Sequence, residues 1–206
     1  ISMFHPDVRP SRIREELNLQ NKFVVLYTGA MGQANDIYTI LRAADRLRDQ
    51  ENISIVLFGD GKEKRNLQAE AQKLGLMNLI FAGVRPKHQI PSIVASADVC
   101  LAILQDIPMF RTTYPNKVFD YMAAGKATIL VIDGVIRSII EDSQGGVYVP
   151  PGDDQRLAQT ILDLTKNPDV LKTMGENARA YLLKNLDREK MLDQSRTLFQ
   201  KLVKES

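Results

Sequence analysis

The sequence has no tryptophan, one cysteine and two histidines among its 206 residues. A lone cysteine cannot form an internal disulfide, so Cys100 indicates a reducing compartment. Its position in the apolar run "ADVCLAIL" predicts a small core residue. His88 has no metal-ligating partner near it in the sequence, and His5 lies in the irregular N-terminal stretch. A metal site is therefore not expected.

A charge excess of one sign is lacking as well. The chain carries 27 basic and 25 acidic residues, for a net charge of +2. Such a balance does not favour nucleic acid as a partner, and any anion site must be local. No apolar run approaches the ~20 residues that a membrane span needs, and no signal peptide is evident. The expected location is the cytoplasm.

The N-terminal stretch lacks any hydrophobic period. "ISMFHPDVRPSR" contains two prolines, and we expect residues 1–20 to form a linker-like segment. The chain starts with Ile1 rather than Met, so we expect a fragment from which an N-terminal domain is missing. The length and the 44% hydrophobic content suit one globular domain with its own core.

Short apolar runs alternate with amphipathic segments over residues 21–152. The predicted strands are "KFVVLYTG", "ISIVLFGDG", "NLIFAG", "DVCLAIL", "ATILVID" and "GGVYVPPGD". This alternation predicts an α/β fold: a Rossmann-like parallel sheet of about six strands with helices on both faces. Residues 153–206 show helical patterns only and are predicted to pack on the core as C-terminal helices. Pro168 and Asp187 mark the predicted starts of the second and third.

Ligands of open α/β sheets bind beyond the carboxyl ends of the strands, so the loops there are the candidates. "TGAMGQAND" places Gly29 and Gly32 where backbone can approach a phosphate. It can equally be a plain turn with Asn35 or Asp36 as a helix N-cap. Neither Gly-x-Gly-x-x-Gly nor a Walker sequence is present, which disfavours a dehydrogenase or a P-loop protein.

Two further loops leave structural and functional interpretations open. In "GDGKEK" the glycines permit a tight turn, and a capping role alone can explain Asp60. In "AGVRPKH", Arg85, Lys87 and His88 form a small basic cluster, and most such clusters are simply solvated.

The stretch "RTTYPNKVFDYMAAGKATIL" is the most informative. Pro115 suits the first helical position and Gly125 the helix C-cap, while Val118 and Met122 can face the core. These features predict a short helix between a loop and an apolar strand.

The polar residues of this predicted helix suggest a ligand. Asn116 and Asp120 are four residues apart and share a face, and Lys117 lies in the first turn. The helix dipole disfavours a cation there unless an anion is also bound, so Lys117 suggests an anion such as a diphosphate. Asp120 can accept hydrogen bonds from a ribose. A solvated Lys–Asp pair worth a few tenths of a kcal/mol explains the spacing equally well.

Six motifs in order carry a resemblance to a known family. "VVLYTGAMGQAND…TILRAADRL", "IVLFGDG", "LIFAGV", "ADVCLAIL", "YPNKVFDYMAAGKATIL" and "GGVYVPPGD" resemble the C-terminal half of a GT-B glycosyltransferase. The resemblance is to the retaining group 1 family that builds bacterial surface polysaccharides, and to its branch with fucosamine-type transferases. It covers roughly residues 1–200.

The resemblance implies a Rossmann-like domain that binds the sugar nucleotide, and a separate N-terminal domain that binds the acceptor and supplies the catalytic groups still unassigned. It implies that the donor diphosphate lies at the start of the Pro115 helix. The implied contacts are Gly29, Gly32, Asn116 and Lys117 for the diphosphate, Thr112, Thr113 and Tyr114 for the donor sugar, and Asp120, Gly83 and Arg85 for the ribose and base.

The implied reaction moves a hexose or N-acetyl-amino sugar from a UDP-sugar to a lipid-linked or polysaccharide acceptor, with no metal or other cofactor. We expect this fragment to be inactive alone and the full enzyme to associate peripherally with the inner face of the membrane. Two alternatives stay open: a GT-B sugar-nucleotide 2-epimerase, and a non-catalytic Rossmann-like binding or interaction domain.

The sequence departs from the family pattern at three positions. The family's Glu-x7-Glu would need Glu at position 112, where Thr112 stands, and Asp120 is the second acid. Ala30 and, roughly, Asn35 stand where the family carries an Arg and a Lys for the diphosphate. Lys117 can supply the missing charge. The departures indicate either altered specificity or lost activity.

Overall fold

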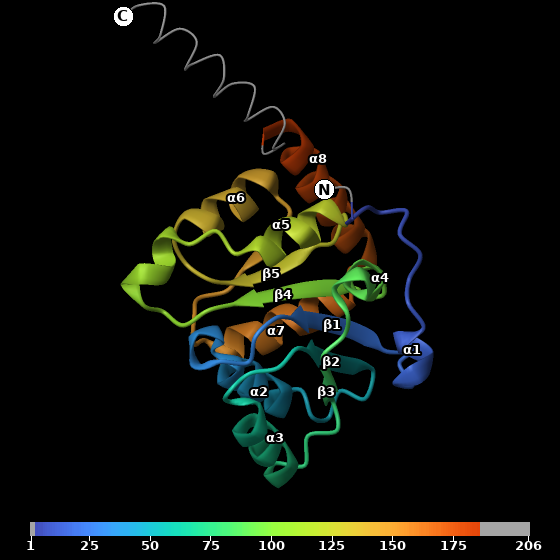
Figure 1. Cartoon of the computed structure of the whole chain (residues 1–206), viewed down its shortest axis with the longest axis vertical. Coiled ribbons are helices and arrows are strands. Elements are labelled where there is room, and N and C mark those ends of the chain that lie inside the picture. The colour runs from blue at the N-terminus through green and yellow to red at the C-terminus, as the bar shows by residue number, and fades with distance from the viewer. Residues whose placement is uncertain (1–2, 186–206) are drawn as a thin grey trace, which may run out of the picture.

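The computed structural model describes residues 3–185, which form one parallel sheet with helices on both faces (Figure 1). The strand order is β3-β2-β1-β4-β5-β6, and every neighbouring pair is parallel. This confirms the expected Rossmann-like fold. The strands are β1 (Phe23–Thr28), β2 (Ile53–Phe58), β3 (Leu79–Gly83), β4 (Val99–Ile103), β5 (Thr128–Val131) and β6 (Gly146–Tyr148).

The helices follow the predicted segments. They are α1 (Ile13–Glu16), α2 (Ile37–Arg46), α3 (Lys64–Lys73), α4 (Ile90–Ala95), α5 (Asn116–Ala123), α6 (Val135–Ser143), α7 (Asp154–Thr165) and α8 (Pro168–Asn185). Three short 3₁₀ helices join them: η1 (Gln33–Asn35), η2 (Lys87–Gln89) and η3 (Pro108–Thr112). The sequence analysis did not anticipate α1, η1 or η3.

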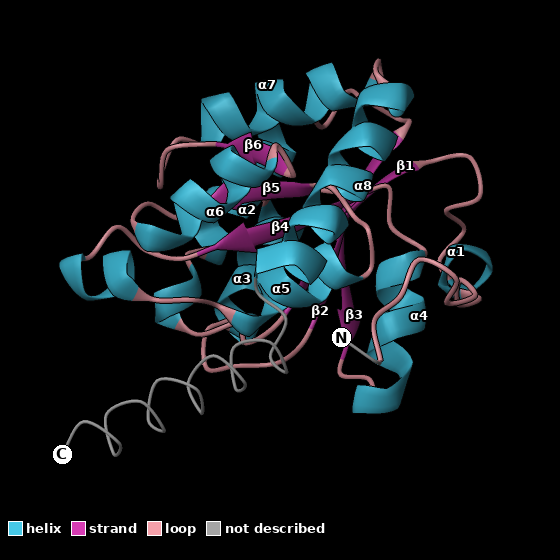
Figure 2. Cartoon of the chain, turned by 90° about the horizontal axis from the view of Figure 1, so that it is seen from above, coloured by secondary structure: helices cyan, strands magenta, loops and turns pink. Residues whose placement is uncertain are grey.

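Successive side chains of each strand point alternately into two separate hydrophobic cores. Val25 and Tyr27 face the core beneath α2, α3 and α7, and Val24 and Leu26 face the core beneath α4, α5 and α8. Figure 2 shows β4 and β5 between α7 and α5. Cys100 is fully buried in the second core, as predicted. Burial on both faces explains why the strands are almost continuous apolar runs.

Helix α5 starts at Asn116, so Pro115 precedes the helix by one residue instead of occupying its first position. Gly125, at φ 66°, follows the C-cap Ala124, which suits a left-handed helix end. Val118 and Met122 are fully buried, as predicted.

The stretch expected to be linker-like packs on the core over its described part. Phe4, Ile13 and Leu19 are buried in the core beneath α4 and α5. The Arg14 guanidinium lies 2.7 Å from the Asp98 carboxylate, which also accepts a hydrogen bond from the Val24 N–H. These contacts anchor the stretch beside the amino ends of β1 and β4.

The two described C-terminal helices pack on the domain, one on each face. Helix α7 lies against α2, where Asp154 pairs with Arg42 at 3.2 Å and with Arg46. Helix α8 starts at Pro168 as predicted and lies against α5 and α6. The third predicted helix, from Asp187, lies outside the described residues.

Candidate functional site

A cavity of about 1070 Å³ opens at the carboxyl edge of the sheet. We call it the carboxyl-edge pocket. It lies where the strand order reverses, between β1 and β4, which is where open α/β sheets bind ligands. Its lining residues are Met3, Phe4, Thr28, Gly29, Ala30, Phe58, Gly59, Asp60, Val84, Arg85, Lys87, Ile90, Asn116, Lys117, Phe119 and Asp120.

Backbone alone forms part of the pocket floor. The Gly29 N–H donates to Phe58 O at 2.9 Å, and the Gly59 N–H donates to Gly83 O at 2.8 Å. A Cβ at Gly59 would lie 1.8 Å from Gly29 O, and the φ of +144° at Gly59 is itself unfavourable for other residues. The two loops therefore approach each other more closely than any side chain allows.

Helix α5 points its N-terminus at this floor. Asn116, Lys117 and Asp120 all line the pocket, although Asn116 and Asp120 are one turn apart. The first N–H groups of a helix have no partners within the helix and carry a partial positive charge. The arrangement favours an anionic ligand group at the start of α5.

Lys117 extends inward from this turn. Its Nζ lies 4.1 Å from the centre of the Tyr27 ring and is buried, with no hydrogen-bond partner among residues 3–185. A Cβ at Gly29 would lie 2.6 Å from that nitrogen. Burial lowers the pKa of Lys117 to about 8. Because the Lys117 nitrogen is buried, the solvated Lys–Asp pair that spacing alone left open is excluded.

Asp120 lies half-buried on the same helix. Burial raises the pKa of its carboxyl, and the charge of Lys87 partly opposes that effect. A half-buried carboxylate facing a cavity is a good acceptor for ligand hydroxyl groups.

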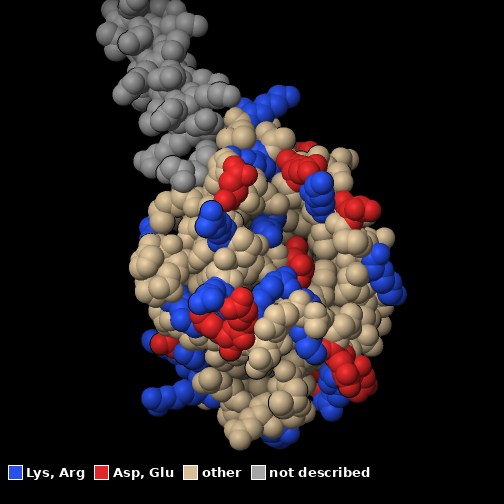
Figure 3. Space-filling view, turned by 90° about the vertical axis from the view of Figure 1, so that its right-hand side faces the viewer, with Lys and Arg blue, Asp and Glu red and all other residues tan. Residues whose placement is uncertain are grey.

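The remaining charges of the pocket come from the loops after β2 and β3. Asp60 accepts a hydrogen bond from the Gly61 N–H at 2.9 Å, and this bond together with the charge of Lys64 lowers the pKa of its carboxyl. Arg85 pairs with Glu16 at 3.0 Å, so its guanidinium is tied to α1. On the face in Figure 3, basic and acidic groups are interspersed.

The pocket brings together Gly29, Asn116, Lys117, Asp120 and Arg85 from the predicted set. Four other predicted residues lie elsewhere. Gly32 lines a separate cavity of about 270 Å³ beside α2. Thr112 and Thr113 donate from their hydroxyls to Met109 O at 3.2 and 3.4 Å. Tyr114 is 53% exposed.

Two predicted residues reach the pocket indirectly. Tyr114 stacks on Phe119, a lining residue, with ring centres 6.4 Å apart. Gly83 contributes only its carbonyl oxygen, which accepts a hydrogen bond from the N–H of the lining residue Gly59. The structure therefore places the predicted sugar contacts in and after η3, beside the pocket instead of inside it.

Sequence reasoning missed several lining residues. Gly59 stands in the noted motif "FGDG" but was interpreted as a turn residue. Tyr27 does not line the pocket, but its ring contacts Lys117, and its position at the end of a buried strand was the available signal. Met3 and Phe4 gave no local signal, because their contact with α5 and the loop after β3 is distant in sequence.

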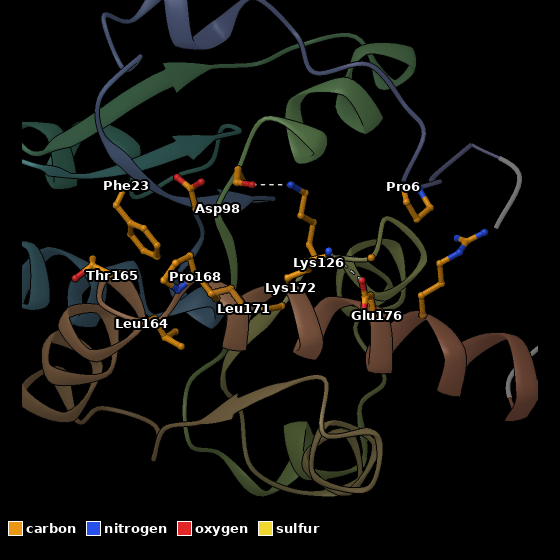
Figure 4. Close-up of a pocket in the computed structure, with 14 residues that line it drawn as sticks. Pro6, Phe23, Asp98, Lys126, Leu164, Thr165, Pro168, Leu171, Lys172 and Glu176 are labelled. Carbon is orange, nitrogen blue, oxygen red and sulfur yellow. Dashed lines mark hydrogen bonds and ion pairs between the residues drawn. The ribbon is translucent and has the colours of Figure 1, made fainter.

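A second cavity, of about 460 Å³, lies at the opposite, amino edge of the sheet (Figure 4). Its charged groups hold the fold together. Lys126 Nζ donates to Ala95 O and Ala97 O at 2.8 and 2.7 Å, and Arg179 donates to Ala123 O. Phe23, Pro168 and Leu171 form its apolar side. The carboxyl-edge pocket is the better candidate because its cation, Lys117, is free of such contacts within the described residues.

Residues 3–185 contain no group of three or more His, Cys, Asp or Glu side chains positioned to hold a metal ion.

No helix within the described part of the chain is long and apolar enough to cross a membrane.

The family model described as glycosyl transferases group 1 matches residues 10–181. The chain belongs to this family. A solved C-terminal domain of a group 1 protein, LpcC from Francisella tularensis, shares the fold. The match covers 89% of this chain and 96% of that domain, with a TM-score of 0.73 and 17% identity. The family match confirms the resemblance to group 1 glycosyltransferases, and the retaining, surface-polysaccharide type stays a prediction.

Two curated relatives are transferases by name. The putative colanic acid biosynthesis glycosyl transferase WcaI of Escherichia coli K12 is 27% identical over 91% of this chain and 46% of its own length. The alpha-D-kanosaminyltransferase of Streptomyces kanamyceticus is 23% identical over 84% of this chain and 44% of its own length. The chain spans about half the length of these relatives.

A solved structure of Anabaena Alr3699/HepE in complex with UDP shares the fold, with a TM-score of 0.81 and 21% identity. The match covers 93% of this chain and 52% of the Anabaena chain.

Proposed function

We propose that this domain binds the sugar-nucleotide donor of a glycosyltransferase, with the diphosphate at the N-terminus of α5. The observation that carries the proposal is Lys117. A buried ammonium group in the first helical turn, without a hydrogen-bond partner among residues 3–185, is unfavourable until an anion joins it. A diphosphate in the carboxyl-edge pocket supplies that anion.

The rest of the pocket suits the other parts of a nucleotide. Asp120 lies on the same face of α5 as Asn116 and offers a carboxylate to the ribose hydroxyls. The loop of Val84 and Arg85 lies across the pocket and suits the base. The donor sugar then extends toward Gly29 and the Tyr114–Phe119 pair, next to Thr112 and Thr113.

UDP is the proposed nucleotide. Support comes from the Anabaena structures, which are complexes with UDP, with UDP and glucose, and with UDP-glucose. A hexose or an N-acetyl-amino sugar is the proposed transferred group, with retention of configuration and no metal requirement, as the family resemblance implies. Lys117 and the N–H groups of α5 would then stabilise the departing nucleoside diphosphate.

The acceptor belongs to the whole protein, and we propose a lipid-linked glycan or polysaccharide. The relatives named for colanic acid and O-antigen synthesis support this class. A further domain would bind the acceptor, and without it we expect donor binding without appreciable transfer. A cytoplasmic location, with peripheral association at the inner membrane face, follows from the same acceptor class.

Calorimetric titration of the domain with UDP and ADP tests the proposal. We expect UDP to bind with a dissociation constant below the millimolar range. Asp120→Ala should weaken binding at least tenfold, because the ribose hydroxyls lose their acceptor. Asp163→Ala on α7, outside the pocket, is the matched control. Absence of binding by either nucleotide at millimolar concentration would overturn the donor-site proposal.

The 2-epimerase and scaffold alternatives make different predictions. An epimerase, once joined to its remaining domain, converts a UDP-sugar to its C2 epimer without an acceptor, and product analysis separates this from transfer. A degenerate scaffold binds no nucleotide, or binds UDP with the same weak affinity in wild type and in Asp120→Ala.

A further inference from the structure

The buried amine of Lys117 has no counter-ion among the described residues, although it lines a cavity suited to anions. Its nearest contact of note is the face of the Tyr27 ring, at 4.1 Å. An aromatic face offsets only part of the free energy that burying an ammonium group costs. The free protein therefore holds this nitrogen in surroundings that disfavour its charged form.

Several titratable groups surround Lys117, and none is placed as its ion-pair partner. Asp60 pairs with Lys64 at 3.5 Å, and Arg85 pairs with Glu16. Lys87 adds positive charge from the β3 side. Asp120 lies on the same helix, and no ion pair joins it to Lys117 in the described structure.

The Tyr27 hydroxyl lies near the Lys117 amine, since a Cβ at Gly29 would meet both groups, and it is already hydrogen-bonded. It donates to Ala30 O at 2.7 Å, and burial raises the pKa of the phenol well above its ordinary value. Tyr27 therefore stays neutral and cannot act as a counter-ion. The missing negative charge has to come from a ligand.

We propose that Lys117 takes up a proton when the diphosphate binds, so that the pocket selects for the diphosphate through a coupled protonation. The inference rests on the proposed donor site and adds a regulation of it by pH. A diphosphate at the N-terminus of α5 brings negative charge next to Lys117 and so favours the ammonium form.

The direction of the pH dependence follows from linkage. In the free protein burial holds the pKa of Lys117 at about 8, and a neighbouring anion raises it. Between the pKa of Lys117 in the free protein and its higher pKa in the complex, the complex binds more protons than the free protein. Affinity for UDP therefore falls as the pH rises through that window. Since the protonated fraction at a pKa near 8 drops from about 0.9 at pH 7 to about 0.1 at pH 9, affinity for UDP should fall about tenfold.

The test is isothermal titration of the domain with UDP at pH 8 in buffers of different ionisation enthalpy. The buffer dependence of the binding enthalpy reports the protons taken up, and we expect about half a proton per UDP. Uridine, which lacks the diphosphate, should show no uptake.

Three variants test which side chain takes up the proton when UDP binds. Lys117→Met should bind UDP more weakly and show no buffer dependence, and Lys117→Arg, which stays charged, should lose the tenfold change between pH 7 and pH 9. Lys87→Met should keep the wild-type proton uptake. The titration of UDP itself is common to all variants and cancels in the comparison.

The outcomes separate this inference from the proposed function. If wild-type protein binds UDP with the same buffer dependence as Lys117→Met, the proton coupling is wrong and the donor site stands. If UDP does not bind at all, both fail. Wild-type buffer dependence that disappears only in Lys87→Met assigns the proton to Lys87 and overturns the inference.

Discussion

At the scale of single residues, Lys117 lowers the stability of the free protein and favours the binding of an anion. A buried amine without a hydrogen-bond partner in the described structure costs folding free energy, and the proposed diphosphate repays that cost only when bound. Residues that bind ligands in this way commonly destabilise the free protein. The trade-off can be measured in the absence of any ligand.

Lys117→Met should raise the free energy of unfolding at pH 7 by about 1–3 kcal/mol, because a pKa lowered by burial reports a cost to the charged form. The folded-state pKa of about 8 lies below the ordinary value of 10.5, so the unfolded chain binds more protons between them. The cost is therefore fully present below pH 8 and is relieved as the pH rises toward 10.5.

Urea denaturation at pH 7 and pH 10 measures this difference. The stabilisation by Lys117→Met should shrink at pH 10, and Lys73→Met on the exposed face of α3 should show no such change. A variant that is less stable than wild type at both pH values would contradict the prediction.

Asp120 permits a second test at this scale. Wild-type protein should bind UDP several-fold more tightly than 2′-deoxy-UDP, and Asp120→Asn should reduce that preference, because an amide accepts ribose hydrogen bonds less strongly than a carboxylate. Calorimetric titration of both ligands against both proteins forms a double-mutant cycle. An undiminished preference in the variant would remove Asp120 from the ribose site.

At the scale of elements, one contact of each C-terminal helix with a neighbouring helix can be tested separately. Asp154 at the start of α7 is 17% exposed and pairs with Arg42 and Arg46 of α2. Gly175 on α8 lies against the end of α5, where a Cβ would come within 2.0 Å of Gly125 O. The first contact is electrostatic and the second is steric, so they respond to different perturbations.

Asp154→Asn should lower the free energy of unfolding by about 1 kcal/mol at pH 7. Burial alone would raise the pKa of this carboxyl, but the hydrogen bonds and charges of Arg46 and Arg42 outweigh burial and hold it below 3.8. The stabilisation is present above that value and is lost as the pH falls below it. Chemical denaturation at pH 7 and pH 3 measures the loss, with Asp163→Asn as the control.

Gly175→Ala should lower the free energy of unfolding by about 1–3 kcal/mol, because the added methyl group pushes α8 away from the α5 backbone. Thermal unfolding checks this, at about 2–4 °C in Tm per kcal/mol for a domain of this size. Gly32→Ala is the control, since an added Cβ there meets nothing within 4 Å. Equal Tm values for the two variants would show that α8 relaxes without cost.

At the scale of the whole molecule, the sequence predicted the strands and helices well and the site only in part. Apolar runs such as residues 23–28 identify buried strands locally, and Pro168 and Gly125 bound their helices. The neighbours of Lys117 were unpredictable from spacing, because Tyr27 and Gly29 reach it only once β1 and α5 meet. Burial of this kind is a property of the assembled fold.

Ligand binding should stabilise the whole sheet, because the pocket joins the ends of β1, β2 and β3 to α5. At a UDP concentration one hundred times the dissociation constant, the free energy of unfolding should rise by about 2.7 kcal/mol. A thermal shift series with UDP, and with uridine as the control, measures this. An unchanged Tm at saturating UDP would mean that the nucleotide binds the unfolded chain equally well.

The backbone floor of the pocket has a consequence for engineering its selectivity. A side chain at Gly59 would displace the backbone of Gly29, and a side chain at Gly29 would displace the amine of Lys117. A directed-evolution library aimed at a new donor therefore gains nothing from randomising the floor. The tunable positions lie on the walls, at Asp60, Val84 and Phe119, and a search confined to them keeps the proposed phosphate site intact.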